Sequence, residues 1–219
     1  MKLSLTRRQC ISAEVAVLLI FQHQPHILEI LGLAEKNSTF DRYRTEAMAL
    51  STISLLVKLA LFWLIIFRSG DPLSDFGIKR PEWRRDGLVF ALAAIGFLGA
   101  YENSFYRVFF GQSHGIFSDG YLAPLWLLGI HYAFVGMAEE SFFRAYLIPR
   151  FEELFGKTWI AVPAQAIIFG LGHAYQGPRG MLEAGVMGLI AGVLFAKYRS
   201  LWPLMLVHAV GDFIIVSTR

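Results

Sequence analysis

The sequence predicts an all-α membrane protein, a bundle of six to seven transmembrane helices with a polar site in its core. Of the 219 residues, 55% are hydrophobic and only 17% are charged, whereas a soluble domain carries about a quarter charged residues. Apolar segments close to the roughly 20 residues that cross a bilayer recur along the chain. Since no linker, low-complexity tract or repeat divides it, we expect one membrane-embedded domain over residues 1–219.

Six segments are predicted to cross the membrane, and a further one is ambiguous. The six are 47–67, 87–106, 121–143, 158–174, 181–198 and 201–217. The third of them continues through "RAYLIPRFEELF" as one long or bent helix. The ambiguous segment, 10–33, either spans or lies as a broken helix at the interface, because it is interrupted by Glu14, His23, Gln24, Pro25, His26 and Glu29. No small-residue cleavage site follows its apolar run, which favours a retained segment over a cleaved signal peptide.

Basic residues between the apolar segments predict the orientation in the membrane. The densest cluster lies in the loop 68–86 and comprises Arg68, Lys79, Arg80, Arg84 and Arg85. Because positive loops stay on the cytoplasmic side, this loop is expected to be cytoplasmic. Alternation then places 144–157 and 197–200 on the same side. The N-terminus joins them if 10–33 spans.

The basic residues do not indicate a nucleic-acid partner. The formal charge is +3, the basic residues cluster in the loops between apolar segments, and the sequence shows no separate basic face. The single Cys10 excludes an intramolecular disulfide. A cysteine protease is also disfavoured, because the helices that carry the candidate histidines contain no thiol.

Other notable residues in the apolar segments have structural explanations. Close helix packing accounts for a small-residue stripe made by Gly185, Gly188 and Gly192. His131 is expected to be a packed core residue. Lys58, in the middle of 47–67, is expected to snorkel or to pair with a carboxylate such as Glu14.

Polar residues in the later segments recur at one helical interval. The pairs four residues apart are Glu140 with Arg144, Phe169 with His173, and His208 with Asp212. Since residues at i and i+4 share a helix face, each segment can direct one polar stripe inward. A lone Glu–Arg pair would be interpreted as a buried ion pair that fixes helix register. Two further helices supplying histidine favour a site, in which Arg144 neutralises one carboxylate and leaves the other to act as a base.

These motifs resemble those of a known family. The order EExxxR, FxxxH, HxxxN/D on successive helices is similar to that of the CAAX-protease and bacteriocin-processing family of intramembrane glutamic endopeptidases. Here the motifs are Glu139-Glu140-Ser-Phe-Phe-Arg144, Phe169-Gly-Leu-Gly-His173 and His208-Ala-Val-Gly-Asp212. "SDFGIKRPEW", residues 74–83, also resembles the amphipathic lead-in of these proteins. The resemblance covers about 74–217, whereas 1–73 show no motif.

The resemblance implies a role for each motif residue. Glu139 would be the general base that takes a proton from water, and His173 would hold and polarise the same water. Glu140 would be locked by Arg144. His208 and residue 212 would donate hydrogen bonds to the oxyanion.

Residue 212 departs from the family pattern. The family often has Asn there, whereas an ionised Asp cannot donate a hydrogen bond. Either Asp212 stays protonated, or it orients His208 and leaves His208 as the sole donor; we favour the second. Simple alternation also separates Glu139 from His173 in depth. The two therefore meet only if the 121–143 helix continues to about residue 155 or the next helix is tilted.

We therefore expect an endopeptidase that needs no cofactor or metal and cleaves membrane-anchored or tail-like substrates, including lipidated ones or those with a C-terminal sorting tail. The expected partners are the lipid bilayer and a peptide or protein, and the expected location is the cell membrane of a bacterium or archaeon. One alternative is a zinc-dependent membrane protease using His173, His208 and one carboxylate, although HExxH is absent. The other is a non-catalytic immunity protein, proton relay or transporter.

Overall fold

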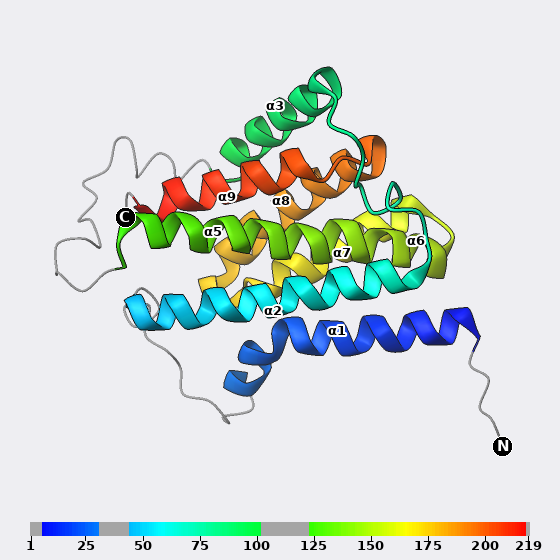
Figure 1. Ribbon diagram of the computed structural model, residues 1–219, viewed down its shortest axis with the longest axis horizontal. Helices are drawn as coiled ribbons and strands as arrows, with labels where there is room; N and C mark the ends of the chain where they lie inside the picture. Colours follow the sequence, from blue (N-terminus) through cyan, green and yellow to red (C-terminus); the bar gives the residue numbers. More distant parts are fainter. Residues whose placement is uncertain (1–5, 31–43, 102–122, 218–219) are drawn as a thin grey trace.

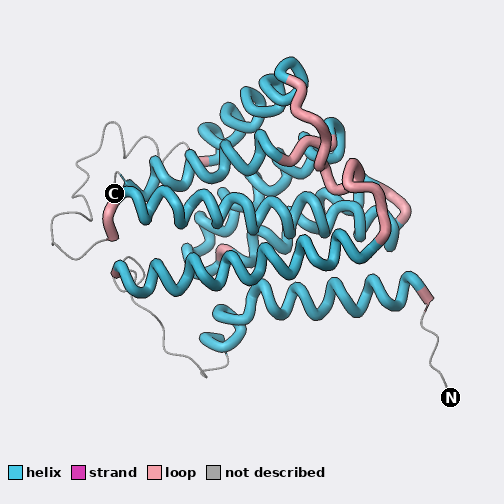
Figure 2. The backbone as a smooth tube through the Cα atoms, in the orientation of Figure 1, coloured by secondary structure: helices cyan, strands magenta, loops and turns pink. Residues whose placement is uncertain are grey.

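The computed structural model describes residues 6–30, 44–101 and 123–217, and within these ranges every regular element is a helix (Figures 1 and 2). The α-helices are α1 (Arg7–Ile30), α2 (Thr45–Ser69), α3 (Trp83–Ala100), α5 (Leu125–Glu140), α6 (Ile148–Phe155), α7 (Thr158–Gly172), α8 (Gly177–Tyr198) and α9 (Trp202–Ser217). A π-helix, η3 (Ser141–Leu147), joins α5 to α6, and a 3-10 turn, η4 (Ala174–Gln176), precedes α8. The predicted all-α architecture is confirmed for the described residues.

The helices α5, η3 and α6 follow one another without a break from Leu125 to Phe155. This agrees with the prediction of one long or bent helix continuing to about residue 155. At about 1.5 Å per residue the run is about 46 Å long, enough to carry residues from one end of the bundle to the other. It ends where Gly156 adopts a left-handed conformation, φ 70°, which suits glycine as a helix cap.

Judged by length and composition, fewer described helices could cross a membrane than the sequence predicts. In the described ranges, two helical stretches are long and apolar enough to cross a membrane, Thr45–Ser69 and Ala174–Tyr198. Thr158–Gly172 and Trp202–Ser217 are apolar but shorter. Helices of 15 and 16 residues reach about 22–24 Å, below the roughly 30 Å of a hydrocarbon core. A bundle of six to seven spans is therefore not confirmed. Residues 31–33, 102–106 and 121–122 of the predicted segments lie outside the described residues.

The outward face of α2 suits lipid better than water. Large apolar side chains there are more than half exposed, including Leu50, Ile53, Val57, Leu64 and Phe67. A helix at a protein–water boundary would carry polar residues on this face.

Small residues permit close approach at two helix crossings, α5 with α9 and α7 with α8. A Cβ on Gly136 of α5 would lie 2.8 Å from the Met205 carbonyl oxygen of α9, so only glycine permits this approach. Between α7 and α8, a Cβ on Gly188 would lie 3.1 Å from the Phe169 ring. The Gln165 side chain also donates a hydrogen bond to the Gly188 carbonyl at 2.8 Å. The glycine stripe of α8 is thus used for helix packing.

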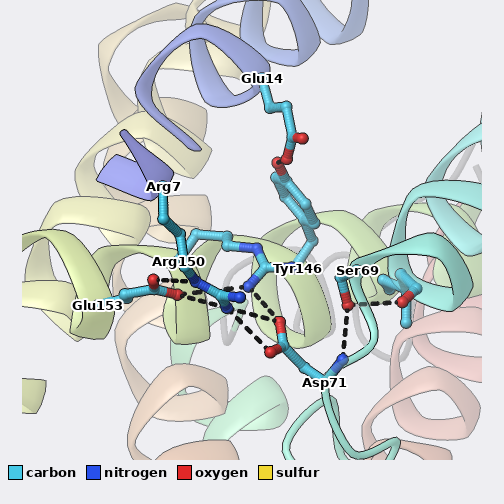
Figure 3. A network of polar contacts seen from close by, with 8 residues as sticks. Arg7, Glu14, Ser69, Asp71, Tyr146, Arg150 and Glu153 are labelled. Carbon is cyan, nitrogen blue, oxygen red and sulfur yellow. Dashed lines mark hydrogen bonds and ion pairs between the residues drawn. The ribbon is translucent and has the colours of Figure 1, made fainter. Parts of the chain in front are cut away.

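Ion pairs tie four segments together at one end of the bundle (Figure 3). Arg7 of α1 and Arg150 of α6 both donate to the Asp71 carboxylate, at 2.9 and 2.7 Å, and Arg7 also binds Glu153. Burial alone would raise the pKa of Asp71, but the hydrogen bonds from Arg150 and Arg7 outweigh it and lower that pKa. A further pair joins Arg199 to Glu152.

The ion-paired residues at this end come from segments that were predicted to share one side of the membrane: Arg7, the loop 68–86, residues 150–153 and Arg199. Arg144 was predicted on the same side but lies in the buried interior, because it pairs with Glu140 there. The location of the other residues agrees with the predicted alternation. That this side is cytoplasmic stays a prediction.

The expected pairing of Lys58 with Glu14 is wrong. Tyr146 donates a hydrogen bond to Glu14 at 3.2 Å, whereas the Lys58 ammonium donates to the Gln22 carbonyl of α1 at 3.3 Å. Figure 3 shows the Glu14 side chain pointing from α1 toward the Tyr146 hydroxyl. Lys58 lies 36 residues from its α1 partner in sequence.

Candidate active site

The two adjacent carboxylates lie at the point where α5 changes into the π-helix η3. Glu139 and Glu140 are the last two residues of α5, and Arg144 lies in the middle of η3. All seven residues of η3 are buried. π-Helical turns inside α-helices are frequent at functional sites. Nothing in the local sequence predicted this change of helix type.

Glu140 links Arg144 to His208 in the interior. Its Oε1 lies 2.9 Å from Arg144 Nη1 and 2.8 Å from His208 Nδ1, and the side chains of Glu140 and Arg144 are 0% exposed. The Arg144 guanidinium also lies over the Phe169 ring, 4.6 Å from its centroid. Among the described residues none of the guanidinium nitrogens has a hydrogen-bond partner of good geometry. Arg144 is therefore held by charge and by the aromatic face.

Two further carboxylates face the other nitrogen of the His208 ring. Nε2 lies 3.6 Å from Glu139 Oε2 and 3.4 Å from Asp212 Oδ2. The side chains of Glu139 and Asp212 are 19% and 26% exposed, so this side of the ring is more open than the Glu140 side. Glu139 Oε2 has no hydrogen-bond partner within the described part of the chain. It is thus a buried acceptor that can receive a proton or a water.

His173 approaches the cluster through Phe169. The ring of Phe169 is 4.7 Å from that of His173 and 6.2 Å, edge-on, from that of His208. His173 Nδ1 lies 2.9 Å from the Phe169 carbonyl oxygen. Because a carbonyl only accepts, Nδ1 carries the hydrogen and the free Nε2 has a lone pair in the neutral ring. No described contact joins His173 directly to the carboxylates.

The structure therefore brings together Glu139, Glu140, Arg144, His208 and Asp212 and places His173 beside them across one aromatic ring. Sequence reasoning paired Glu140 with Arg144 but did not foresee that Glu140 also binds His208. It also gave Phe169 no role beyond a motif position. The sequence signal for a role of Phe169 was its position one helical turn before the motif residue His173.

His131 lies apart from this cluster. Its Nδ1 is 2.9 Å from the Thr52 hydroxyl of α2, in agreement with a packed helix-interface residue. Across the described residues, no group of three or more His, Cys, Asp or Glu side chains has an arrangement that could hold a metal ion. The three ligands that the zinc alternative requires do not converge there.

A comparison with protein families matches the part of the chain that holds this cluster. A family model described as Rce1-like, type II CAAX prenyl endopeptidase, matches residues 121–214. The resemblance drawn from the three motifs is therefore confirmed over this segment. Comparisons with curated proteins and with solved structures found no match.

The Rce1-like segment contains all six predicted site residues and runs from before α5 to the last turn of α9. It covers less than half of the chain, and α1, α2 and α3 lie outside it. The match points to a membrane protein with protease activity, a hydrolase that acts on a peptide or protein.

Proposed function

We propose that the chain is an intramembrane endopeptidase in which Glu139 and histidine side chains activate a water molecule against a peptide bond. The observation that carries the proposal is that Glu139 Oε2, which accepts no hydrogen bond from the described residues, lies 3.6 Å from His208 Nε2 within the Rce1-like segment. This distance is too long for a direct hydrogen bond but allows one water to contact both atoms.

Glu139 is assigned as the general base. It takes one proton from the water, and the hydroxide oxygen attacks the scissile carbonyl carbon. The carbonyl π electrons move to the oxygen, giving a tetrahedral oxyanion. When the C–N bond breaks, the proton held by Glu139 passes to the departing amine, so water is consumed and both carboxylate and histidine are restored. Positioned acid–base groups of this kind contribute about 10²–10⁴-fold to the rate.

His208 is assigned as the oxyanion donor. Its Nδ1–H donates to the Glu140 carboxylate, which Arg144 holds in place. For Nε2 to donate as well, the ring must carry both protons. The surrounding carboxylates of Glu139, Glu140 and Asp212 favour that charged form. One such donor is worth about 3 kcal/mol of barrier.

Asp212 is assigned to orient His208 rather than to contact the oxyanion. Its Oδ2 lies on the Nε2 side of the ring at 3.4 Å, where an ionised carboxylate accepts and cannot donate. His173 is assigned to the attacking water, which its free Nε2 can accept a hydrogen bond from. The substrates proposed are membrane-anchored or tail-like peptides, lipidated ones included.

The test uses the full-length protein in detergent with internally quenched peptides, one carrying a prenylated cysteine near its C-terminus and a matched one without the lipid. Glu139→Gln keeps size and shape, and we expect a loss of at least about 100-fold in kcat. His208→Ala should be nearly as harmful. Asp212→Asn should retain substantial activity or exceed wild type, since it adds a donor.

Each variant is assayed with and without a chelator to separate this mechanism from the zinc alternative. Comparison of membrane proteomes from cells with and without the protein identifies natural substrates by their uncut tails. A Glu139→Gln protein that processes its substrate at the wild-type rate would end the proposal.

A further inference from the structure

Lys58 is a charge in the middle of the most lipid-suited helix, and neither the motifs nor the Rce1-like segment accounts for it. Between Glu46 and Arg68, it is the one charged residue in the sequence of α2. Its side chain is half-buried, with the ammonium 3.3 Å from the Gln22 carbonyl and 5.9 Å from the Phe21 ring centroid. A charge inside a membrane helix is costly and usually faces a partner or cavity.

The register of α2 against α5 and η3 places Lys58 level with Glu139. Two contacts fix this register: Thr52 with His131, 2.9 Å apart, and Phe62 with Phe142, whose rings stack at 4.9 Å. The partners differ in number by 79 and 80, so the two helical segments run parallel. The same offsets bring Lys58 opposite positions 137–138, immediately beside Glu139.

The side chains also share facing stripes. Lys58 is four residues before Phe62, and Glu139 is three residues before Phe142, so each pair lies on one face of its helix. Because Phe62 stacks on Phe142, the faces that carry Lys58 and Glu139 point toward each other. The register and the shared faces thus place Lys58 and Glu139 on facing sides of two adjoining helices.

The charges of the candidate site leave room for one more cation. Glu139, Glu140 and Asp212 supply three negative charges, and Arg144 with a doubly protonated His208 supplies two positive ones. Lys58 would bring the sum to zero.

The titratable groups around Glu139 come from several elements. On the same helical run and on α9 they are Glu140, Arg144, His208 and Asp212; from the other elements packed around the site they are Lys58, His173, His23, Tyr101 and Glu183.

We propose that Lys58 is a positioning residue of the site, the counter-charge that keeps Glu139 ionised and directed toward the water position. The catalytic meaning of this role rests on the proposed function, but the electrostatic pairing does not. It makes α2, and through the Gln22 carbonyl α1, part of a site whose motifs all lie in the Rce1-like segment.

The test measures the protonation of Glu139 without a substrate. Dicyclohexylcarbodiimide is a hydrophobic reagent that modifies protonated carboxyl groups, and peptide mass spectrometry distinguishes Glu139 from Glu140. The full-length protein in nanodiscs is labelled across a range of pH values. Lys58→Met should move the labelling midpoint of Glu139 upward by about one pH unit, the lower end of the shift that a neighbouring opposite charge produces. Lys58→Arg should keep the wild-type midpoint.

The matched control is Arg68→Met, which removes the same charge from an exposed position of the same helix, about 15 Å further along the axis. It should leave the midpoint unchanged. Lys58→Met should still insert into the membrane, because removing a charge from the centre of a helix favours insertion. Lys58→Gln, which also removes the charge, serves as a second variant. With the quenched peptides, the acid limb of the pH–rate profile should move with the labelling midpoint while KM stays constant.

A Lys58→Met protein that labels at the wild-type midpoint overturns the role of Lys58 and leaves the proposed function standing. A fully active Glu139→Gln protein refutes the proposed function, whereas a shifted midpoint would still establish the pairing.

Discussion

Arg144→Met removes the positive charge from the interior while keeping most of the side-chain volume. The wild-type guanidinium is 0% exposed, lies 2.9 Å from the Glu140 carboxylate, and has the Phe169 ring 4.6 Å from its centre. With Met in its place, Glu140 remains buried, and His208 is the one side chain in the described residues that still contacts it with a positive charge. The variant therefore tests whether this pair is needed for stability.

The magnitude follows from the burial of both partners. Breaking a buried pair from one side costs about 3–5 kcal/mol, because the remaining charge is uncompensated. For a chain of this size that corresponds to a fall in Tm of about 6–20 °C. Arg144→Ala should lose about 2 kcal/mol more, since it also leaves a cavity. The double variant Glu140→Gln/Arg144→Met should be more stable than the sum of its two single variants predicts.

The assay is thermal unfolding of the purified protein in detergent, followed by intrinsic fluorescence. The chain offers a matched control in Arg179 and Glu183, which have the same i,i+4 spacing on α8 but an arginine that is 60% exposed. Arg179→Met should change the free energy of unfolding by less than about 1 kcal/mol. If Arg144→Met melts at the same temperature as Arg179→Met, the buried pair does not stabilise the fold and the reasoning fails.

Three further outcomes are expected. Gly136→Ala should lower the free energy of unfolding by about 1–3 kcal/mol and lower activity, because it forces α5 away from α9. Gly129→Ala on the same helix should be neutral, since its new Cβ would meet only a ring atom at 3.8 Å. Equal melting temperatures for the two variants would contradict this prediction. Because the pKa of Asp71 is lowered in the folded protein, its contribution to stability is complete above the unfolded pKa near 4 and is lost as pH falls through the folded value. Asp71→Asn should therefore melt at a lower temperature than wild type at pH 7, and the two Tm values should converge in acid. A series of Tm measurements across pH checks this. In a Cys10→Ser background, Ser74→Cys should react with an impermeant thiol reagent only after permeabilisation, and labelling in intact cells reverses the topology.

The helices and the grouping of the motif side chains could be predicted from the sequence because both depend on short periodicities. The six apolar stretches correspond to α2, α3, α5, α7, α8 and α9 with small differences at the described ends, since a run of apolar residues flanked by Gly, Pro or charge indicates a helix directly. The motif spacing likewise identified side chains that share a helix face. These properties are local, so one chain without relatives was enough.

The register between helices could not be predicted in the same way. That Glu140 accepts from His208, and that Lys58 lies level with Glu139 instead of pairing with Glu14, depends on contacts such as Phe62 on Phe142. Such contacts are set by side-chain shapes across two helices and leave no period in the sequence. No local sequence pattern indicates the π-helix after Glu140 either. The packing around it, and not the propensity of its residues, decides the helix type.

Asp212 connects the motif pattern within one helix to the register between helices. In an Asp212→Asn variant, Glu139 and Glu140 would be the two carboxylates left around His208 among the described residues, and Arg144 with a doubly protonated His208 would balance them. Asp212 adds a third negative charge 3.4 Å from His208 Nε2, and a buried site does not tolerate an unbalanced charge. The compensating cation must then come from a helix outside the motifs, and the register of α2 puts Lys58 at that level. On this reasoning Asp212 and Lys58 are coupled: Asp212→Asn should partly restore the wild-type labelling midpoint of Glu139 that Lys58→Met has raised, since each substitution removes one charge of opposite sign from the same site.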